Sequence, residues 1–156
     1  MPPVLSIVGK SESGKTTRIE KLIPVLKLRG YRIGIVKHAH HGFDMDREGK
    51  DSYRHRTAGA TEVLLASRKR YALMHELRAE DEPALDTLLA KLAPVDLVLI
   101  EGYKRDAHPK IEAFRAETKN PLIATDDPTV KAIASDTPLD MDRPVFDLND
   151  TVAIAD

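Results

Sequence analysis

The chain has 156 residues, of which 42% are hydrophobic, and this suits a single domain over residues 1–156 with one buried core. Its net charge is -1, so the composition indicates neither a nucleic-acid partner nor a membrane surface. The lack of cysteine excludes disulfides and thiolate metal sites and fits a reducing compartment. No apolar run approaches the ~20 residues that span a bilayer, and residues 1–4 lack the basic start of a signal peptide. We therefore expect a soluble, cytoplasmic protein.

The first motif along the chain lies at residues 9–17, where the sequence GKSESGKTT matches the phosphate-binding pattern G-x-x-x-x-G-K-[ST]. An apolar run at 4–8 precedes it and a helical pattern follows it, which is the strand-loop-helix context of a P-loop. Its glycines let successive N–H groups point at phosphate oxygens, a lysine reaches the β- and γ-phosphates, and a threonine hydroxyl completes a Mg²⁺ shell. The predicted nucleotide-binding residues are Gly9, Lys10, Ser11, Glu12, Ser13, Gly14, Lys15, Thr16 and Thr17, with Thr16 also a Mg²⁺ ligand.

Lys10 stands five positions before Lys15. A lysine at this offset is typical of a subgroup of dimeric P-loop ATPases, in which it reaches into the partner's active site. The alternative is a solvated loop lysine, which is favoured because Ser11-Glu12 stands where that subgroup carries a pair of glycines.

The segment after the P-loop predicts a helix over 16–29, followed by Gly30 at a C-terminal cap position. Pro24 removes one backbone donor within it and is expected to bend or loosen the helix. Residues 32–37 predict a second strand, so the chain begins with a β-α-β unit. The apolar stripe of the helix consists of Ile19, Leu22, Ile23 and Leu26.

A polar segment rich in histidine, aspartate and glycine follows from Ala39 to Gly49, and it predicts a loop at the ligand-binding edge of the sheet. Three interpretations stay open: a loop that responds to the γ-phosphate, a surface for a substrate or partner, or a second metal site. The H-x-H-H spacing of His38, His40 and His41 occurs in metal sites but is not diagnostic. The candidates taken from this region are His38 for nucleotide binding and Asp46 and Asp51 for catalysis, together with Lys15.

The rest of the chain alternates between strand and helix patterns. This alternation predicts an α/β, P-loop NTPase-like three-layer sandwich with a mainly parallel central sheet. The expected helices lie at 51–60 and 83–92, and the expected strands at 61–66, 71–77, 95–100, 111–115 and 130–134.

Glu101 directly follows the most apolar of these strands, at the position where a P-loop protein needs an acid for Mg²⁺. The alternative is a surface carboxylate in a turn. Asp96 lies at the opposite end of the strand and is not expected to reach the metal. The sequence therefore predicts Glu101 and Thr16 as the metal ligands.

The residues that read the base are weakly encoded. The guanine-reading pattern T-K-x-D is interrupted at 118–121, where Pro121 replaces the aspartate. Asp126 and Asp136 each follow a possible strand, and either carboxylate can accept from the N1 and N2 donors of guanine. Each can equally be a turn residue, and Asp136 is kept as the candidate nucleotide-binding residue.

Several segments together resemble the MobB family of molybdopterin-guanine dinucleotide biosynthesis adaptor proteins. These are the P-loop, Lys37-His38 with His40-His41, Gly49-Lys50-Asp51-Ser52-Tyr53, Ala58-Gly59-Ala60, Glu101-Gly102-Tyr103-Lys104 and Ala134-Ser135-Asp136. The resemblance implies a homodimeric GTP-binding protein with Mg²⁺, at most a weak GTPase and mainly an accessory protein. It implies a MobA-like guanylyltransferase as the partner, which attaches GMP to the molybdenum-pterin cofactor, and molybdopterin as a candidate ligand. The segment 46–52 would respond to the nucleotide or face that enzyme.

Two other classes of P-loop protein are alternatives. A small-molecule kinase needs an arginine-rich lid over the phosphates, and the only candidate cluster, Arg68-Lys69-Arg70, is short and reads as a solvated turn. A metallochaperone GTPase would use the histidine segment, but such proteins usually add cysteine ligands.

Overall fold

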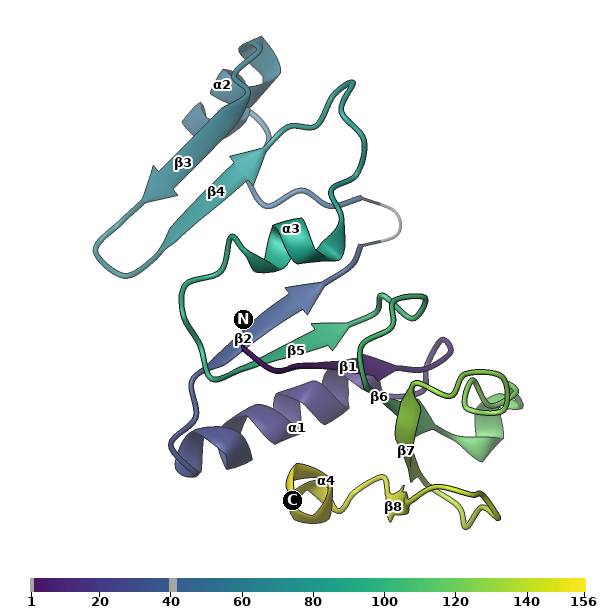
Figure 1. Cartoon of the computed structure of the whole chain (residues 1–156). Coiled ribbons are helices and arrows are strands. Elements are labelled where there is room, and N and C mark those ends of the chain that lie inside the picture. Colours follow the sequence, from purple (N-terminus) through teal and green to yellow (C-terminus); the bar gives the residue numbers. More distant parts are fainter. Residues whose placement is uncertain (1, 40–41) are drawn as a thin grey trace. The chain divides into compact units, whose positions relative to one another are not determined.

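The computed structural model describes residues 2–39 and 42–156, so the predictions for His40 and His41 lie outside the described residues. The chain divides into two compact units, one formed by Met1–His38 and Leu89–Asp156 and the other by Ala39–Leu88. The single-domain organisation stays a prediction, and each unit is described by itself below. Figure 1 labels the elements along the chain, apart from the short 3-10 helix η1 (Ala116–Thr118).

The first unit contains a six-stranded sheet in which every described strand pair is parallel. The strand order is β2-β5-β1-β6-β7-β8, which confirms the predicted P-loop NTPase-like α/β fold with a mainly parallel central sheet. β5 separates β1 from β2, so the two strands of the first β-α-β unit are not neighbours. The strands are β1 (Val4–Val8), β2 (Ile33–Lys37), β5 (Leu97–Glu101), β6 (Lys110–Phe114), β7 (Val130–Ser135) and β8 (Val145–Asp147).

Helix α1 (Lys15–Leu28) covers one face of this sheet because its predicted apolar stripe is buried against the strands. Leu22 and Leu26 pack with Ile7 of β1 and Leu99 of β5 in one core cluster. Helix α4 (Thr151–Ala155) packs on the same side, where Ile154 contacts this cluster (Figure 1). Pro24 lies inside α1, which continues through it to Leu28.

The other face of the sheet is covered, within this unit, by irregular segments. Val8, Val130 and Ile133 are buried there with Ala124, and side chains from the loops 121–124 and 139–141 pack over them. The Glu112 carboxylate holds one of these loops, because it accepts 2.8 Å hydrogen bonds from the N–H groups of Ile123 and Ala124. These paired donors explain why a segment with strand-like composition forms a turn instead.

Two sequence predictions need correction, and two short elements were not predicted. The residues before Asp126 form a turn rather than a strand, since the Asp126 N–H donates to the Ile123 carbonyl. The helix predicted over 83–92 is only α3 (Leu85–Leu89), because the chain closes with a Leu92 to Leu89 turn. Strand β8 and helix α4 were not predicted, because elements of three and five residues carry too little periodicity to be seen in sequence.

The second unit contains helix α2 (Asp51–Ala58) and the antiparallel strands β3 (Glu62–Ala66) and β4 (Tyr71–His75). The predicted helix and both strands are confirmed, but the strands form their own two-stranded sheet rather than joining the central one. The cluster Arg68-Lys69-Arg70 lies in the turn between them, where the Ser67 hydroxyl accepts from the N–H groups of Lys69 and Arg70. It is therefore an exposed hairpin turn.

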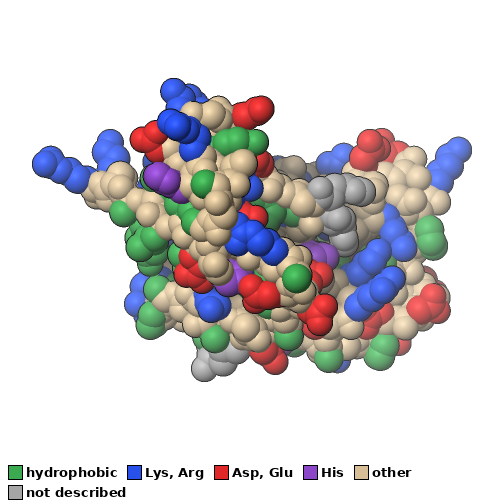
Figure 2. Space-filling view, turned by 90° about the horizontal axis from the view of Figure 1, so that it is seen from above, with side chains coloured by type: hydrophobic (Ala, Val, Ile, Leu, Met, Phe, Trp, Pro, Cys, Tyr) green, Lys and Arg blue, Asp and Glu red, His purple; other side chains and the backbone are tan. Residues whose placement is uncertain are grey.

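Acidic and basic side chains are interspersed over the face shown in Figure 2, in keeping with a net charge of -1. Such a surface creates no strong field of one sign. Among the described residues, none of the helices has the length and apolar character needed to cross a bilayer.

Candidate nucleotide-binding site

The P-loop lies between the end of β1 at Val8 and the start of α1 at Lys15, as the motif predicts. A Cβ at Gly9 would lie 2.2 Å from the Ser13 Oγ and 2.7 Å from the Ala113 carbonyl oxygen, so only glycine fits there. Gly14 has φ 92, in the left-handed region that glycine adopts without strain. The loop closes through a 3.2 Å hydrogen bond from the Ser13 N–H to the Lys10 carbonyl. Both motif glycines are thus required by the backbone itself.

The start of α1 has the chemistry of an anion site. Gly14 occupies the N-cap, so no side chain caps the helix, and its first turn carries no acidic residue. Uncapped N–H groups and the helix dipole favour a phosphate at this point. The Ser13 Oγ is buried and has no hydrogen-bond partner within the described ranges. Lys15 begins the helix and Thr17 is exposed in its first turn, so the donor set fits a polyphosphate.

The two predicted Mg²⁺ ligands meet directly. The Thr16 hydroxyl donates a 2.6 Å hydrogen bond to the Glu101 Oε1, which brings together residues from α1 and the end of β5. A hydroxyl and a carboxylate are oxygen ligands of the kind that Mg²⁺ takes, and that ion completes its shell with phosphates and water. No group of three or more His, Cys, Asp or Glu side chains placed to hold a metal occurs among the described residues.

His38 lies beside Glu101 at the same edge of the sheet. Its N–H donates to the Glu101 carbonyl at 3.1 Å, and its ring lies 4.7 Å from that of Tyr103. Gly102, which separates Glu101 from Tyr103 in the chain, has φ 104, and a Cβ there would lie 3.3 Å from the His38 Cβ. The turn after β5 therefore packs against His38.

The charge of Lys10 affects the buried carboxyl group of Glu112 in the same chain. Burial raises the pKa of the Glu112 carboxyl, while hydrogen bonds from Ile123 and Ala124 and the charge of Lys10 oppose that shift. Glu112 is 1% exposed, so a cation that stabilises its charged form has a structural role. Whether Lys10 has a further role at a partner's site stays a prediction.

Sequence reasoning missed two arginines next to the P-loop. Arg18 is buried in α1 and donates to the Leu148 carbonyl and to the Asn149 side chain. Arg115 directly follows β6, and its Nε and Nη2 lie 3.6 Å from the position of a Cβ on Gly14. The available signal was the place of Arg115 at the end of a strand predicted over 111–115, at the ligand-binding edge.

Of the two base-reading candidates, the structure brings only Asp136 to this edge. Asp136 follows β7 directly, and its Oδ1 accepts a 3.1 Å hydrogen bond from the Ala116 N–H. Asp126 lies in the turn described above. Asp136 is thus held next to the end of β6, the strand that neighbours β1.

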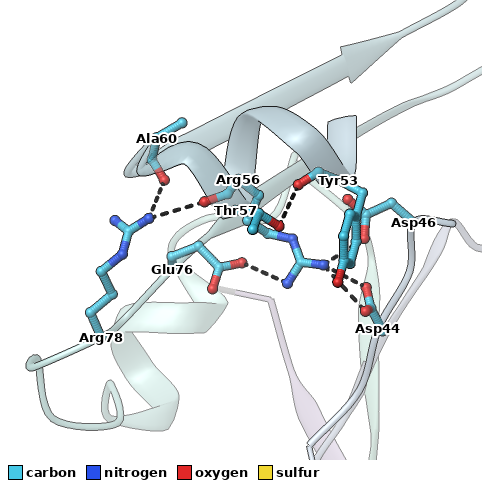
Figure 3. A network of polar contacts seen from close by, with 8 residues as sticks. All are labelled: Asp44, Asp46, Tyr53, Arg56, Thr57, Ala60, Glu76 and Arg78. Atoms are coloured by element: carbon cyan, nitrogen blue, oxygen red, sulfur yellow. Dashed lines mark hydrogen bonds and ion pairs between the residues drawn. The ribbon is translucent and has the colours of Figure 1, made fainter. Parts of the chain in front are cut away.

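The predicted catalytic residues Asp46 and Asp51 belong to the second unit, so their role toward the P-loop stays a prediction. Asp46 is 3% exposed and pairs with Arg56 at 3.0 Å, while its Oδ2 has no partner in the described part of the chain. Figure 3 shows Arg56 reaching from α2 toward Asp44, Asp46 and Glu76, which hold it from three directions.

Asp51 begins α2 and lines an open hollow of about 670 Å³ in the second unit. Glu48, Gly49, Tyr53 and His55 share this lining, so most of the Gly49–Tyr53 segment noted in the sequence is grouped here. The charged residues of its lining are Glu48, Asp51 and Arg54.

Comparison with known proteins gives a consistent result. A family model described as molybdopterin guanine dinucleotide synthesis protein B matches residues 4–136. The molybdopterin-guanine dinucleotide biosynthesis adapter protein of Escherichia coli (strain K12) is 43% identical over 159 residues, covering 100% of this chain and 91% of that protein. The protein of the same name from Haemophilus influenzae is 44% identical over 156 residues, with 99% and 86% covered.

Solved structures agree with these relatives. The crystal structure of Bacillus subtilis MobB has a TM-score of 0.77 and 28% identity, and the match covers 97% of this chain and 93% of that one. A MobB protein homolog from Bacillus stearothermophilus has a TM-score of 0.69 at 28% identity, covering 97% and 92%.

Proposed function

This chain belongs to the molybdopterin guanine dinucleotide synthesis protein B family, and from that premise we propose that it binds GTP with Mg²⁺ at its P-loop. It is an adapter in molybdopterin guanine dinucleotide biosynthesis. In this proposal it assists a separate guanylyltransferase, which attaches GMP to the molybdenum-pterin cofactor, and molybdopterin is a candidate ligand of the same complex.

The observation that carries this proposal is the contact between Thr16 and Glu101. It joins the P-loop helix to the end of β5 at 2.6 Å, beside helix N–H groups that no side chain caps. When bound, Mg²⁺ supplies charge that neutralises the β- and γ-phosphates. The chain's own part is to orient the triphosphate with backbone N–H groups, to add the Lys15 charge, and to position the metal with two oxygens.

Slow hydrolysis is part of the same proposal. Fast phosphoryl transfer to water needs a group that orients the attacking water. Asp46 and Asp51 are the candidates for that task, but one oxygen of Asp46 is already paired with Arg56. The Asp46 oxygen that accepts from Arg56 is not free to orient a water, in keeping with slow turnover.

The homodimer of the proposal is supported by the β3–β4 hairpin. Its apolar side chains are exposed: Leu64 by 65%, Tyr71 by 72% and Leu73 by 52%. Leu64 and Leu73 are direct cross-strand partners, so they form one continuous apolar surface. A two-stranded sheet is marginal alone and presents unpaired strand edges, so a second copy of the same hairpin is a fitting partner. Changing Leu64 and Leu73 to glutamate should therefore give a folded monomer in sedimentation velocity, whereas a dimer unaffected by both changes contradicts this use of the hairpin.

Titration of the purified chain with GTP and ATP, with and without Mg²⁺, tests the nucleotide part. We expect GTP to bind more tightly with Mg²⁺ present, and Lys15→Ala to weaken binding at least about 100-fold while the circular dichroism spectrum stays unchanged. Unchanged GTP affinity in that variant would refute the P-loop role. Addition of the chain to a purified guanylyltransferase tests the adapter role, and the yield of guanylated cofactor should rise.

A further inference from the structure

Two residues of opposite charge stand side by side where β6 and β7 end. The strands are parallel neighbours whose last register pair is Phe114 with Ser135. Arg115 and Asp136 are the next residues of the two strands, and the Asp136 N–H still donates to the Phe114 carbonyl at 3.4 Å. Neighbouring strands lie about 4.8 Å apart, so these residues are adjacent at the ligand-binding edge.

Although adjacent, the two charged groups are not paired with each other among the described residues. Asp136 uses its Oδ1 to accept from the Ala116 N–H, and its second oxygen has no recorded partner there. Arg115 has a 3.6 Å contact with Glu117, an exposed carboxylate, through its Nη1. Its Nε is buried and has no acceptor within residues 2–39 and 42–156. A buried donor without an acceptor is costly, and it points to a missing partner.

The unsatisfied side of Arg115 faces the P-loop. Both Nε and Nη2 lie 3.6 Å from the position of a Cβ on Gly14, so this pair of donors is turned toward the loop rather than toward Glu117. The nearby Arg18 donates through its Nη1 to the Leu148 carbonyl and Asn149, while its own Nε is also buried without an acceptor in the described part of the chain. Its pKa is lowered by burial and by the charge of Arg115, so the two cations are close. A ligand with acceptor atoms near Arg115 would give its guanidinium the hydrogen-bond partner that it lacks.

The chemistry of guanine matches this arrangement on two edges. Guanine presents the acceptors O6 and N7 together, the pair that an arginine contacts with two donors. Its N1–H and N2 amino donors suit a carboxylate oxygen. Adenine carries an amino donor in place of O6 and has no N1–H, so it would oppose both residues.

We propose that Arg115 and Asp136 select guanine, Arg115 by donating to O6 and N7 and Asp136 by accepting from N1 and N2. The phosphates of the same nucleotide occupy the P-loop, so this inference rests on the proposed function. Asp136 was a candidate from the sequence, whereas Arg115 and the pairing of the two residues come from the register of β6 and β7.

Nucleoside diphosphates with altered bases test each contact by calorimetric titration, without any turnover. Inosine diphosphate lacks the N2 amino group, 7-deaza-GDP lacks the N7 acceptor, and xanthosine diphosphate carries a carbonyl oxygen in place of N2. Asp136→Asn keeps an oxygen for the Ala116 N–H and presents an amide donor in place of the second carboxylate oxygen. Arg115→Met keeps the length of the side chain and removes its donors.

The wild-type chain should bind inosine diphosphate and 7-deaza-GDP each about 10-fold more weakly than GDP. Asp136→Asn should lose about 10- to 100-fold for GDP, bind inosine diphosphate as well as GDP, and gain at least about 10-fold for xanthosine diphosphate. Arg115→Met should lose about 10-fold for GDP and no longer distinguish it from 7-deaza-GDP. The gain for xanthosine diphosphate cannot arise from misfolding.

Matched controls come from residues in similar local settings. Asp147 ends β8, and its Oδ1 accepts from the Asn149 N–H at 2.8 Å, so Asp147→Asn makes the same change one strand further along. Arg29 pairs with Asp156 at 2.6 Å near the other end of α1, so Arg29→Met removes an arginine away from the P-loop. Both controls should bind all four diphosphates as the wild type does.

Three outcomes overturn the inference while leaving nucleotide binding in place. The first is wild-type GDP affinity in both variants, and the second is the lack of a xanthosine diphosphate gain in Asp136→Asn. The third is an equal loss for GDP and 7-deaza-GDP in Arg115→Met, which would assign Arg115 to the phosphates. If the wild-type chain binds no guanine nucleotide at all, the proposed function itself fails.

Discussion

The P-loop edge of the central sheet and the unit of residues 39–88 are built in different ways. At the P-loop edge the geometry comes from backbone: the conformations of Gly9 and Gly14, the start of α1, and parallel strand ends. In the 39–88 unit it comes from side chains, with one arginine among three carboxylates and an apolar hairpin left exposed. A backbone site is rigid and suits phosphate binding, whereas an ion-paired segment can rearrange when its partners change.

The largest effect is expected from Gly9→Ala. The new Cβ would lie 2.2 Å from Ser13 Oγ and 2.7 Å from the Ala113 carbonyl, so the loop must shift. GTP binding should fall by at least about 100-fold, and stability by about 1–3 kcal/mol from overpacking. Calorimetric titration and thermal unfolding measure the two effects. Gly30→Ala is the control for GTP binding alone, because nothing lies within 4 Å of a Cβ there while its φ of +91 makes alanine strained. Normal GTP binding by Gly9→Ala would contradict the role of backbone geometry.

Arg56→Met is expected to loosen the 39–88 unit and to leave the P-loop edge unchanged. This change leaves the Asp46 carboxylate, which is 3% exposed, without its cation, and Asp44 and Glu76 lose the same partner. Hydrogen exchange should become about 10- to 100-fold faster in residues 42–58, while exchange in α1 stays unchanged. Arg54→Met, on an exposed position of the same helix, is the control. If hydrogen exchange became equally faster in both units, the two regions would not differ in the way described above.

A smaller and more selective effect is expected from Glu101→Gln. The amide still accepts from the Thr16 hydroxyl but lacks the charge that attracts Mg²⁺. Mg²⁺-dependent GTP hydrolysis should fall about 10-fold or more, while GTP affinity measured without Mg²⁺ changes less than about 3-fold. Asp96→Asn, at the other end of the β5 strand, is the control. Equal loss of hydrolysis and of metal-free binding would count against the metal assignment.

The smallest effect concerns pH in the hairpin unit. Hydrogen bonds to Glu62 at 2.8 Å and to Glu80 at 2.9 Å raise the pKa of His75 above its ordinary value of 6.5. A raised folded-state pKa means that this stabilisation is fully present below 6.5 and is lost as pH rises through the folded value. NMR titration of the His75 ring should show a midpoint above 6.5 that falls when Glu62 and Glu80 are both changed to glutamine. An unchanged midpoint would show that the carboxylates do not act on His75.

Much of the first region could be predicted from sequence because its signals are local. The P-loop is a continuous motif, its glycines and helix start need only neighbouring residues, and α1 carries an apolar stripe. The position of Glu101 at the end of a buried strand was also predicted, and its role as a Mg²⁺ ligand stays a prediction. The adjacency of Arg115 and Asp136 was not predicted, because the register of β6 and β7 cannot be read from the sequence of the loop that joins them.

The sequence by itself determined the P-loop motif, the parallel α/β class and the family, because these depend on spacing within short stretches. Only the tertiary structure decided that β5 lies between β1 and β2, that β3 and β4 form a separate sheet, and that the buried Glu112 accepts hydrogen bonds from Ile123 and Ala124. Strand order, register and burial are set by which distant surfaces pack together. Contacts between segments far apart in the chain produce no periodic pattern in the sequence, so they cannot be predicted from it.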